Sequence, residues 1–195
     1  MKKQSPCNFI HASQGKNDEC YTERYAVEPL LEFLEDYSFE LCKACKKNWF
    51  PHWKPIIWCP FDTEESEFVK VFQENGYRVE FSHIKYGQDF FSYEPKEWDI
   101  MISNPPWTGK RYIVRRALSF NKPFALLLPI TWLNDAAPHE EFEGKDRQEL
   151  NFKKRMQFKN YSGKINYLSV YYCWNFLPKQ IVTRDFVNIN QKKLF

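Results

Sequence analysis

The sequence predicts an α/β fold with a mixed, mostly parallel sheet of seven strands flanked by helices. Short apolar strands alternate with helical patterns between residues 56 and 130, an order typical of parallel βαβ units. The strand patterns at 155–159 and 168–177 have no helix between them, which predicts antiparallel strands near the end of the chain. The chain has 195 residues, 43% of them hydrophobic and 27% charged, and it therefore suits a single globular domain.

The N-terminal part predicts a helix after a loose segment. Residues 1–20 are polar and show no period, so we expect them to be loose. Thr22 is suited to cap a helix over 23–36, in which alanine, valine and leucine recur at helical spacing.

Three short strands are expected next, at 56–59, 77–84 and 98–102. A helix over 64–75 lies between the first two of them. Gly76 marks its end, because glycine readily takes the left-handed conformation that often follows a helix.

A helix over 110–120 and a buried strand over 123–130 complete the alternation. Residues 134–152 are strongly charged and predict a surface loop with a short helix. No repeat or low-complexity stretch divides the chain, so residues 1–195 are expected to form one domain.

Glycine content and hydropathy exclude several classes of protein. The six glycines form no GxG pair, whereas the P-loop and the dinucleotide fingerprint both need glycines at fixed spacing. The longest apolar run, 123–130, is far shorter than the roughly 20 residues of a membrane span. No apolar segment follows Lys2 and Lys3 as it does in a secretory signal. We therefore expect a cytoplasmic protein without a membrane partner, whose cysteines are mostly reduced.

The tetrapeptide Asn104-Pro105-Pro106-Trp107 directly follows an apolar strand. In open α/β sheets, ligands bind beyond the carboxyl ends of the strands. The two prolines fix the backbone and present carbonyl oxygens, Asn104 adds a side-chain oxygen, and Trp107 adds a flat face for stacking. These groups suit the binding of a planar amino group. A proline-rich turn that closes a core strand is the alternative.

This tetrapeptide resembles motif IV, (D/N/S)PP(Y/F/W), of S-adenosylmethionine-dependent amino-methyltransferases. Together with the tail at 171–178, it looks like the small, phage-type DNA N6-adenine methyltransferases. The resemblance implies a Rossmann-like class I methyltransferase fold and catalytic roles for Asn104, Pro105, Pro106 and Trp107. In that family the Asn oxygen, which also lies at the cofactor site, and the first Pro carbonyl hold the target amino group, and the aromatic residue stacks on a flipped-out base.

Two other segments resemble cofactor-binding parts of the same family. Residues 87–91 are similar to the G-x-D-F/L segment after the third strand, which implies that Asp89 accepts from the cofactor's adenine and that Phe90 packs on its ring. The segment that begins with Tyr21 and Thr22 resembles one that closes over the methionine end of the cofactor. From the residues alone, Asp89 equally suits an Asx-turn, and the Tyr21-Thr22 pair suits capping and core packing.

The glycine-rich motif I of the family is altered in this chain. Residues 58–64 keep Pro60 and Phe61 of a D-P-F variant but lack both glycines. The resemblance implies cofactor contacts by Pro60, Phe61 and Asp62. Asp62 either caps the following helix or accepts from the cofactor's amino group or ribose.

Cys42 and Cys45 have the spacing of zinc ligands, and Cys20, His52 and Cys59 are candidates to complete a set. A single CxxC pair is weak support, because two cysteines one helical turn apart more often simply pack. We therefore expect no metal site.

The expected partner is DNA, with RNA as the alternative. The net charge of +3 is small, but five basic residues flank the motif or follow the charged stretch: Lys110, Arg111, Arg115, Lys153 and Lys154. The chain leaves no room for a separate target-recognition domain. Contacts to phosphates would therefore dominate, which predicts relaxed sequence specificity and strong salt dependence. For any one of these cations, solubilising a helix face is the alternative.

The resemblance thus implies transfer of a methyl group from S-adenosylmethionine to an exocyclic amino group, with adenine N6 in DNA as the expected target. Two other functions stay open. An amino-methyltransferase of RNA or of protein glutamine shares motif IV. A noncatalytic nucleic-acid or protein binder would keep the fold and lose the glycine-rich cofactor loop.

Overall fold

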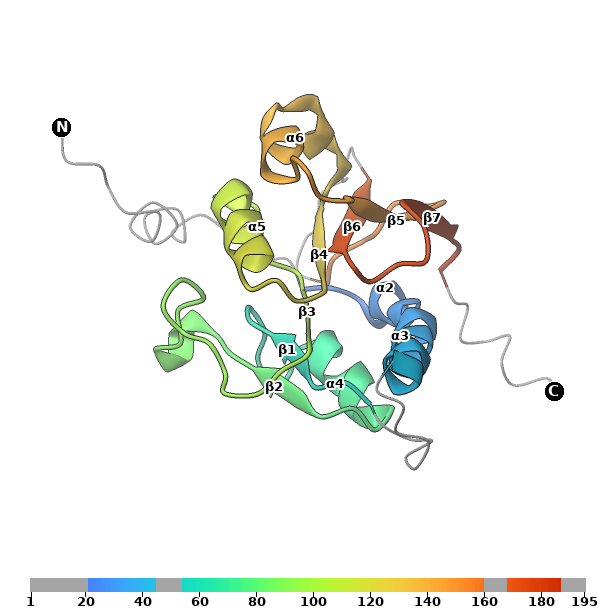
Figure 1. The fold of residues 1–195 in the computed structure, drawn as a ribbon. Helices are drawn as coiled ribbons and strands as arrows, with labels where there is room; N and C mark the ends of the chain where they lie inside the picture. Colours follow the sequence, from blue (N-terminus) through green and yellow to red (C-terminus); the bar gives the residue numbers. More distant parts are fainter. Residues whose placement is uncertain (1–20, 45–53, 160–167, 187–195) are drawn as a thin grey trace.

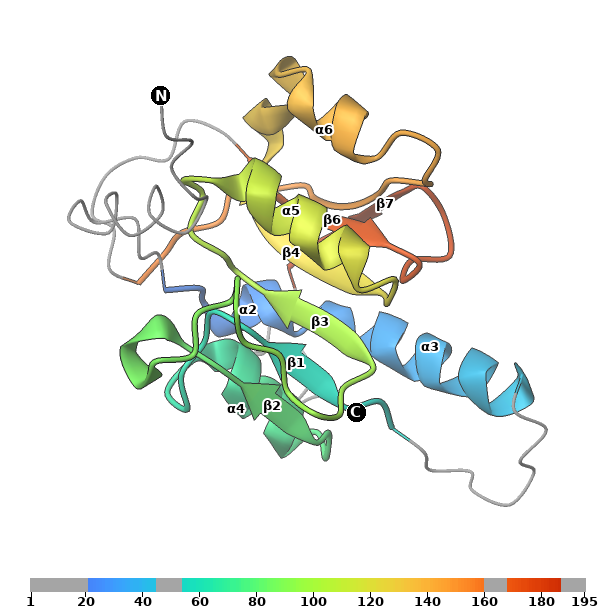
Figure 2. The same cartoon turned by 60° about the vertical axis from the view of Figure 1, so that its left-hand side comes forward.

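A computed structural model describes residues 21–44, 54–159 and 168–186. Within these ranges, seven strands form one sheet in the order β2-β1-β3-β4-β6-β5-β7. Helices α2, α3 and α4 lie on one face of the sheet, and α5 and α6 lie on the other (Figures 1 and 2). The predicted α/β class with a mixed, seven-stranded sheet flanked by helices is confirmed. The expectation for residues 1–20 lies outside the described residues.

The strands are β1 (Ile57–Cys59), β2 (Val79–Phe81), β3 (Ile100–Ser103), β4 (Phe124–Pro129), β5 (Gln148–Phe152), β6 (Ser169–Trp174) and β7 (Ile181–Arg184). β6 runs antiparallel to both of its neighbours, β4 and β5, and the remaining neighbour pairs are parallel. The carboxyl ends of β1, β3 and β4 therefore share one edge of the sheet. The chain builds outward from β1 to β2 and then, after crossing back to β3, in the other direction, so a topological switch point lies between β1 and β3.

The helices are α2 (Arg24–Val27), α3 (Leu30–Ala44), α4 (Glu67–Glu74), α5 (Lys110–Ser119) and α6 (Ala137–Glu141), with short 3-10 helices η1 (Ile84–Tyr86) and η2 (Ile130–Asn134). Within the described part of the chain, no helix combines the length and the apolar character that a membrane crossing requires.

The single helix expected over 23–36 is wrong. The chain forms α2 and α3 instead, and Pro29 lies between them, where its missing N–H cannot continue the helical hydrogen bonds. Glu23 rather than Thr22 occupies the N-cap position of α2. The helix expected from residue 64 begins only at Glu67, because the Ser66 hydroxyl accepts from the Phe68 N–H and caps it there.

The C-terminal third differs more from expectation. The charged stretch 134–152 contains α6, as expected, but its last five residues form β5. Hydrogen bonding to β6 and β7 on both sides outweighs the weak strand pattern of this segment. Residues 155–159 form no strand, and only Phe158 makes a bridge, to Thr22.

Aromatic side chains fill the core on the α5 and α6 face of the sheet. Trp58 is fully buried on β1, with ring centroids 5.1 Å from Trp98 and 5.7 Å from Phe90. Its indole N–H donates to the Ser82 hydroxyl at 3.0 Å. The high aromatic content thus serves packing here, because tilted and edge-to-face ring pairs are favourable inside a core.

Candidate functional site

The NPPW loop (residues 104–107) leaves the carboxyl end of β3 at the centre of the sheet edge. The last residue of β3, Ser103, is fully buried. Two residues separate the loop from α5, and the second of them, Gly109, has a φ of 76°, in the left-handed region that glycine adopts without strain. The loop therefore lies at the switch point between β1 and β3, where open α/β sheets bind ligands.

Asn104 is tied to the N-terminal part of the described chain. Its Nδ2 donates to the Thr22 Oγ1 at 3.1 Å, across 82 residues of sequence. Thr22 is buried, with 7% of its surface exposed. Two of the segments that the sequence singled out separately therefore meet at one point. Thr22 contacts the NPPW loop and does not cap a helix.

A second segment holds Thr22 in this position. The Lys159 N–H donates to the Tyr21 carbonyl at 3.0 Å, and Phe158 forms the bridge with Thr22. The Gln157 N–H donates to the Tyr25 hydroxyl at 2.8 Å. Residues 157–159 thus run alongside residues 21–25, and both pass close to the NPPW loop. Tyr21 itself is 56% exposed.

Trp107 is partly buried and packs against the apolar clusters on both faces of the sheet. Its indole N–H donates to the Leu127 carbonyl of β4 at 3.3 Å. Its ring meets the edge of Phe158, with centroids 5.9 Å apart. The side chain that we expected to stack on a base is therefore anchored to the neighbouring strand.

Asp62 is buried in the loop after β1, on the other side of the switch point. Its two carboxylate oxygens accept from the Ser66 and Ser103 hydroxyls, each at 2.5 Å. Burial raises its pKa from the usual 3.8 to about 6, and the two serine hydroxyls oppose this shift. Asp62 therefore does not cap α4 itself. It fixes Ser66, which does, and it joins the loop after β1 to the end of β3.

Asp89 lies in the loop between β2 and β3. Its Oδ1 accepts from the Phe91 N–H at 3.0 Å, which is the Asx-turn alternative. The segment follows the second strand, since no strand lies between β2 and β3, where every residue is described. Phe90 is 3% exposed and packs on Phe61 at 4.8 Å. Phe90 therefore belongs to the core, while the half-buried Phe61 covers it.

Pro60 closes β1 and is buried. Its carbonyl accepts from the Ser82 hydroxyl at 3.4 Å, so the loop after β1 is also tied to the residue after β2. In the NPPW loop, Pro105 is buried and Pro106 is half-buried. The three prolines and two carboxylates of the candidate site thus lie within loops that follow β1, β2 or β3.

Two of the five cations expected to contact phosphates form ion pairs with glutamates of α6. Arg111 binds Glu140 and Glu141 of α6 at 2.5 and 2.7 Å. Arg115 binds Glu141 at 2.6 Å. Glu141 is largely buried, and the two arginines, Arg115 foremost, lower its pKa. These charges hold α6 against α5, which reduces their availability for phosphates.

The other three cations are more accessible. Lys153 pairs with Asp185 at 2.7 Å, and both side chains are about 60% exposed. Lys154 is exposed, and Lys110 is half-buried at the start of α5. Lys153 and Lys154 follow β5, which is parallel to β4 through their shared neighbour β6. They therefore lie toward the same sheet edge as the NPPW loop.

Sequence reasoning missed three residues that build this site: Ser66, Ser103 and Phe158. The positions of the two serines are visible in the sequence, since Ser66 precedes a helix and Ser103 ends a strand. Their shared hydrogen-bond partner, Asp62, is known only from the tertiary structure. Phe158 carries no signal, because its role depends on which segment crosses the sheet edge.

The zinc candidate cannot be placed as a set. Cys20, Cys45 and His52 lie outside the described residues, as does the side chain of Cys42, and Cys59 is buried in β1. Among the described residues, no group of three or more His, Cys, Asp or Glu could hold a metal ion.

Comparison of the chain with protein-family models and with curated proteins gave no match. The geometry of the site is therefore what supports a function.

Proposed function

We propose that this protein transfers a methyl group from S-adenosylmethionine to an exocyclic amino group, with adenine N6 in DNA as the target, on a Rossmann-like class I methyltransferase fold. The observation that carries the proposal is the Asn104–Thr22 hydrogen bond at the switch point of the sheet. The Tyr21-Thr22 segment and the NPPW loop each resemble this family, and they are far apart in the sequence. If both belong to one site they should be in contact, whereas two unrelated turns need not be.

The hydrogen bond also orients the Asn104 amide. Thr22 engages the donor nitrogen, and the Oδ1 atom on the other side of the amide is the acceptor that the proposal assigns to one N–H of the target amino group. The carbonyl of Pro105, held by two consecutive prolines, is assigned to the second N–H. Accepting both hydrogens turns the nitrogen lone pair out of the ring plane. Positioning of this kind provides the catalysis, and no general base is required.

The residues present fit the cofactor in part. Tyr21 and Thr22 lie beside the NPPW loop, and Asp89 with the half-buried Phe61 offers a carboxylate and an aromatic wall. S-adenosylmethionine, when bound, supplies an electrophilic methyl group. Asp62 is better suited to hold the loop than to contact the cofactor, because Ser66 and Ser103 already use both of its oxygens.

A calorimetric titration with S-adenosylmethionine, followed by an assay of labelled methyl transfer, tests the proposal. We expect heat of binding and incorporation of label into duplex DNA. Incorporation only into RNA, or only into protein at glutamine, would move the target to that class and keep the chemistry. No binding at millimolar cofactor would refute methyl transfer altogether.

One observation favours a noncatalytic nucleic-acid binder as the second candidate. Motif I lacks its glycines, and the Asp62 carboxylate in the same loop is fully engaged within the protein. Under this alternative, duplex DNA binds and S-adenosylmethionine does not. The same titration, repeated with DNA in place of the cofactor, separates the two.

A further inference from the structure

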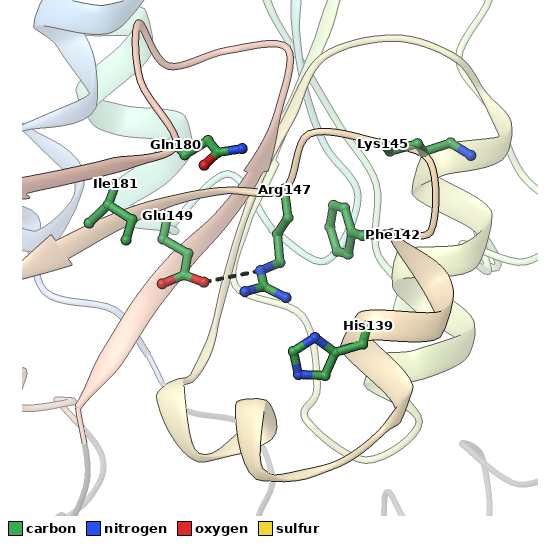
Figure 3. Close-up of a pocket in the computed structure, with 7 residues that line it drawn as sticks. All are labelled: His139, Phe142, Lys145, Arg147, Glu149, Gln180 and Ile181. Carbon is green, nitrogen blue, oxygen red and sulfur yellow. Dashed lines mark hydrogen bonds and ion pairs between the residues drawn. The ribbon is translucent and has the colours of Figure 1, made fainter.

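A cavity lies away from the NPPW loop, on the α6 side of the sheet. Its volume is about 290 Å³, and α6, the segment after it and the strands β5 and β7 line it (Figure 3). Arg147 precedes β5 and Gln180 precedes β7, so the cavity opens toward the amino ends of these strands. The NPPW loop follows the carboxyl end of β3, at the opposite edge. None of the residues assigned to methyl transfer lines this cavity.

Three of the seven residues that line the cavity are basic. His139 comes from α6, and Lys145 and Arg147 come from the segment that connects α6 to β5. Glu149 is the one acidic group among the described residues that line it, and it is largely buried. The lining therefore carries more positive than negative charge.

The ion pair within the cavity fixes the position of the Arg147 guanidinium and leaves most of its N–H groups available to a ligand. The Arg147 Nε donates to the Glu149 Oε1 at 3.1 Å, and no other described residue accepts a hydrogen bond from Arg147. A guanidinium has five N–H groups, and this bond uses one of them. Figure 3 shows the head of Arg147 between the Glu149 carboxylate and the His139 ring. Glu149 thus holds the guanidinium in place, with most of its donors available.

Behind this pair lies a buried hydroxyl. Tyr172 is opposite Glu149 in the register of β5 and β6, and its Oη is buried without a hydrogen-bond partner in the structure. Burial and the Glu149 carboxylate raise the pKa of Tyr172, while Arg147 lowers it. Both charges therefore lie near a desolvated hydroxyl, in surroundings where an ionic hydrogen bond is stronger than in water.

Of the other three lining residues, Gln180 is polar and two are apolar. Phe142 is 4% exposed and Ile181 is 64% exposed, so a flat group at the cavity can pack between a fixed ring and an open aliphatic side chain. The volume is near the lower end of ligand pockets, about 300 Å³. The cavity thus combines several cations with a small apolar wall.

We propose that this cavity binds a phosphate-bearing ligand of nucleotide size. Guanidinium groups bind phosphate with two parallel hydrogen bonds, and a phosphate monoester, which carries more charge than a carboxylate, makes use of Lys145 and His139 as well as Arg147. A free nucleotide and the terminal phosphate of a nucleic-acid strand share this chemistry. The site is independent of the proposed methyl transfer.

The test uses uridine 5′-monophosphate, because adenine nucleotides could enter the proposed cofactor site. Binding is measured by calorimetry, with uridine and inorganic phosphate as comparison ligands. We expect uridine 5′-monophosphate to bind at least tenfold more tightly than uridine. Lys145→Gln should weaken its binding about tenfold, and Lys70→Gln, on the exposed surface of α4, should leave it unchanged.

Arg147→Gln alone would leave the Glu149 carboxylate buried without its cation. The Arg147→Gln/Glu149→Gln double variant removes both charges together, and circular dichroism confirms that it is folded. We expect it to bind uridine 5′-monophosphate at least tenfold more weakly than the wild type. A 5′-phosphorylated oligouridylate that binds more tightly than the mononucleotide identifies a strand end as the source, and the reverse order identifies a free nucleotide. Equal binding of uridine and its monophosphate, or unchanged binding in both variants, would overturn the proposal.

Discussion

The Asp62 carboxylate accepts a hydrogen bond from the Ser103 hydroxyl at 2.5 Å, and this bond joins the loop after β1 to the last residue of β3. Ser103 immediately precedes Asn104. The start of the NPPW loop is therefore held by a buried carboxylate that lies 41 residues before Ser103 in the chain. Because Asp62 also engages Ser66 at the start of α4, one side chain links two strand ends and a helix.

We predict that the Asp62→Asn variant changes how stability depends on pH. The pKa of Asp62 is raised in the folded protein from 3.8 to about 6, so between these values the folded state holds a proton that the unfolded state has released. The stability that this proton contributes is present below about pH 4 and is lost as the pH rises through 6. The loss is on the order of 3 kcal/mol, and asparagine, which does not ionise, avoids it.

Urea unfolding at pH 4.5 and at pH 7.5 measures this effect. The free energy of unfolding of the wild type should fall relative to that of Asp62→Asn between the two values. Glu65→Gln, at an exposed position before α4, serves as the control and should show no such change. A constant difference between wild type and Asp62→Asn at both pH values would contradict the raised pKa.

Asn104→Ala should abolish most methyl transfer while leaving the fold intact. The variant removes an oriented acceptor, whose loss typically lowers a rate by about 100-fold or more. Methyl incorporation measures the rate, and cofactor calorimetry shows whether the site is still formed. Asn134→Ala, an exposed position at the end of η2, should retain full activity. Equal activity of the two variants would show that the NPPW loop is only a structural turn.

Thr22→Val should lower the rate of methyl transfer, because it removes the hydroxyl that receives the Asn104 Nδ2–H and keeps the side-chain shape. A hydrogen bond of this kind contributes about 1 kcal/mol, so we expect a loss of roughly five- to tenfold. Thr22→Ser keeps the hydroxyl and should restore most of the rate. A Thr22→Ser variant as impaired as Thr22→Val would indicate that packing of the methyl group matters instead.

The exposed lysines should contribute more to nucleic-acid binding than the arginines of α5. Lys154 is exposed, whereas Arg115 is paired with Glu141. Replacing a residue that contacts a phosphate reduces the slope of log affinity against log salt by about one. We expect this reduction for Lys154→Gln and a smaller one for Arg115→Gln, measured by fluorescence anisotropy with duplex DNA. If Arg115→Gln gives the larger reduction, the ion pair between Arg115 and Glu141 of α6 must break when DNA binds.

Local patterns in the sequence determined the first two thirds of the fold. The strands of the parallel half, β1 to β4, and the helices α4 and α5 match segments predicted from apolar periodicity, with β3 extending one residue beyond its predicted end. Each of them has a buried side whose spacing is a property of the segment alone. The placement of the NPPW loop at the carboxyl end of a strand follows from the same patterns.

Helix boundaries and the C-terminal strands depended on contacts that periodicity does not record. Ser66 shortens α4 because its hydroxyl is available as a cap, and β5 forms in a charged segment because β6 and β7 supply its backbone hydrogen bonds. A strand that pairs on both sides tolerates side chains with poor strand propensity. For the same reason the pattern at 155–159, which has no partner strand in the sheet, remains irregular.

The sequence by itself singled out the candidate site residues: Asn104 and the prolines after it, Asp62, Asp89 and the Tyr21-Thr22 pair. Only the tertiary structure decided what each of them contacts. It joined Thr22 to Asn104, gave the Asp62 carboxylate to two serines, and paired Arg111 and Arg115 with α6. Hydrogen bonds and ion pairs act over about 3 Å, and the partners here lie between 4 and 82 residues apart in the chain. Residue type shows that a side chain can form a hydrogen bond or an ion pair, but not with which partner. Chain topology, which brings the ends of β1 and β3 together, decides the partner.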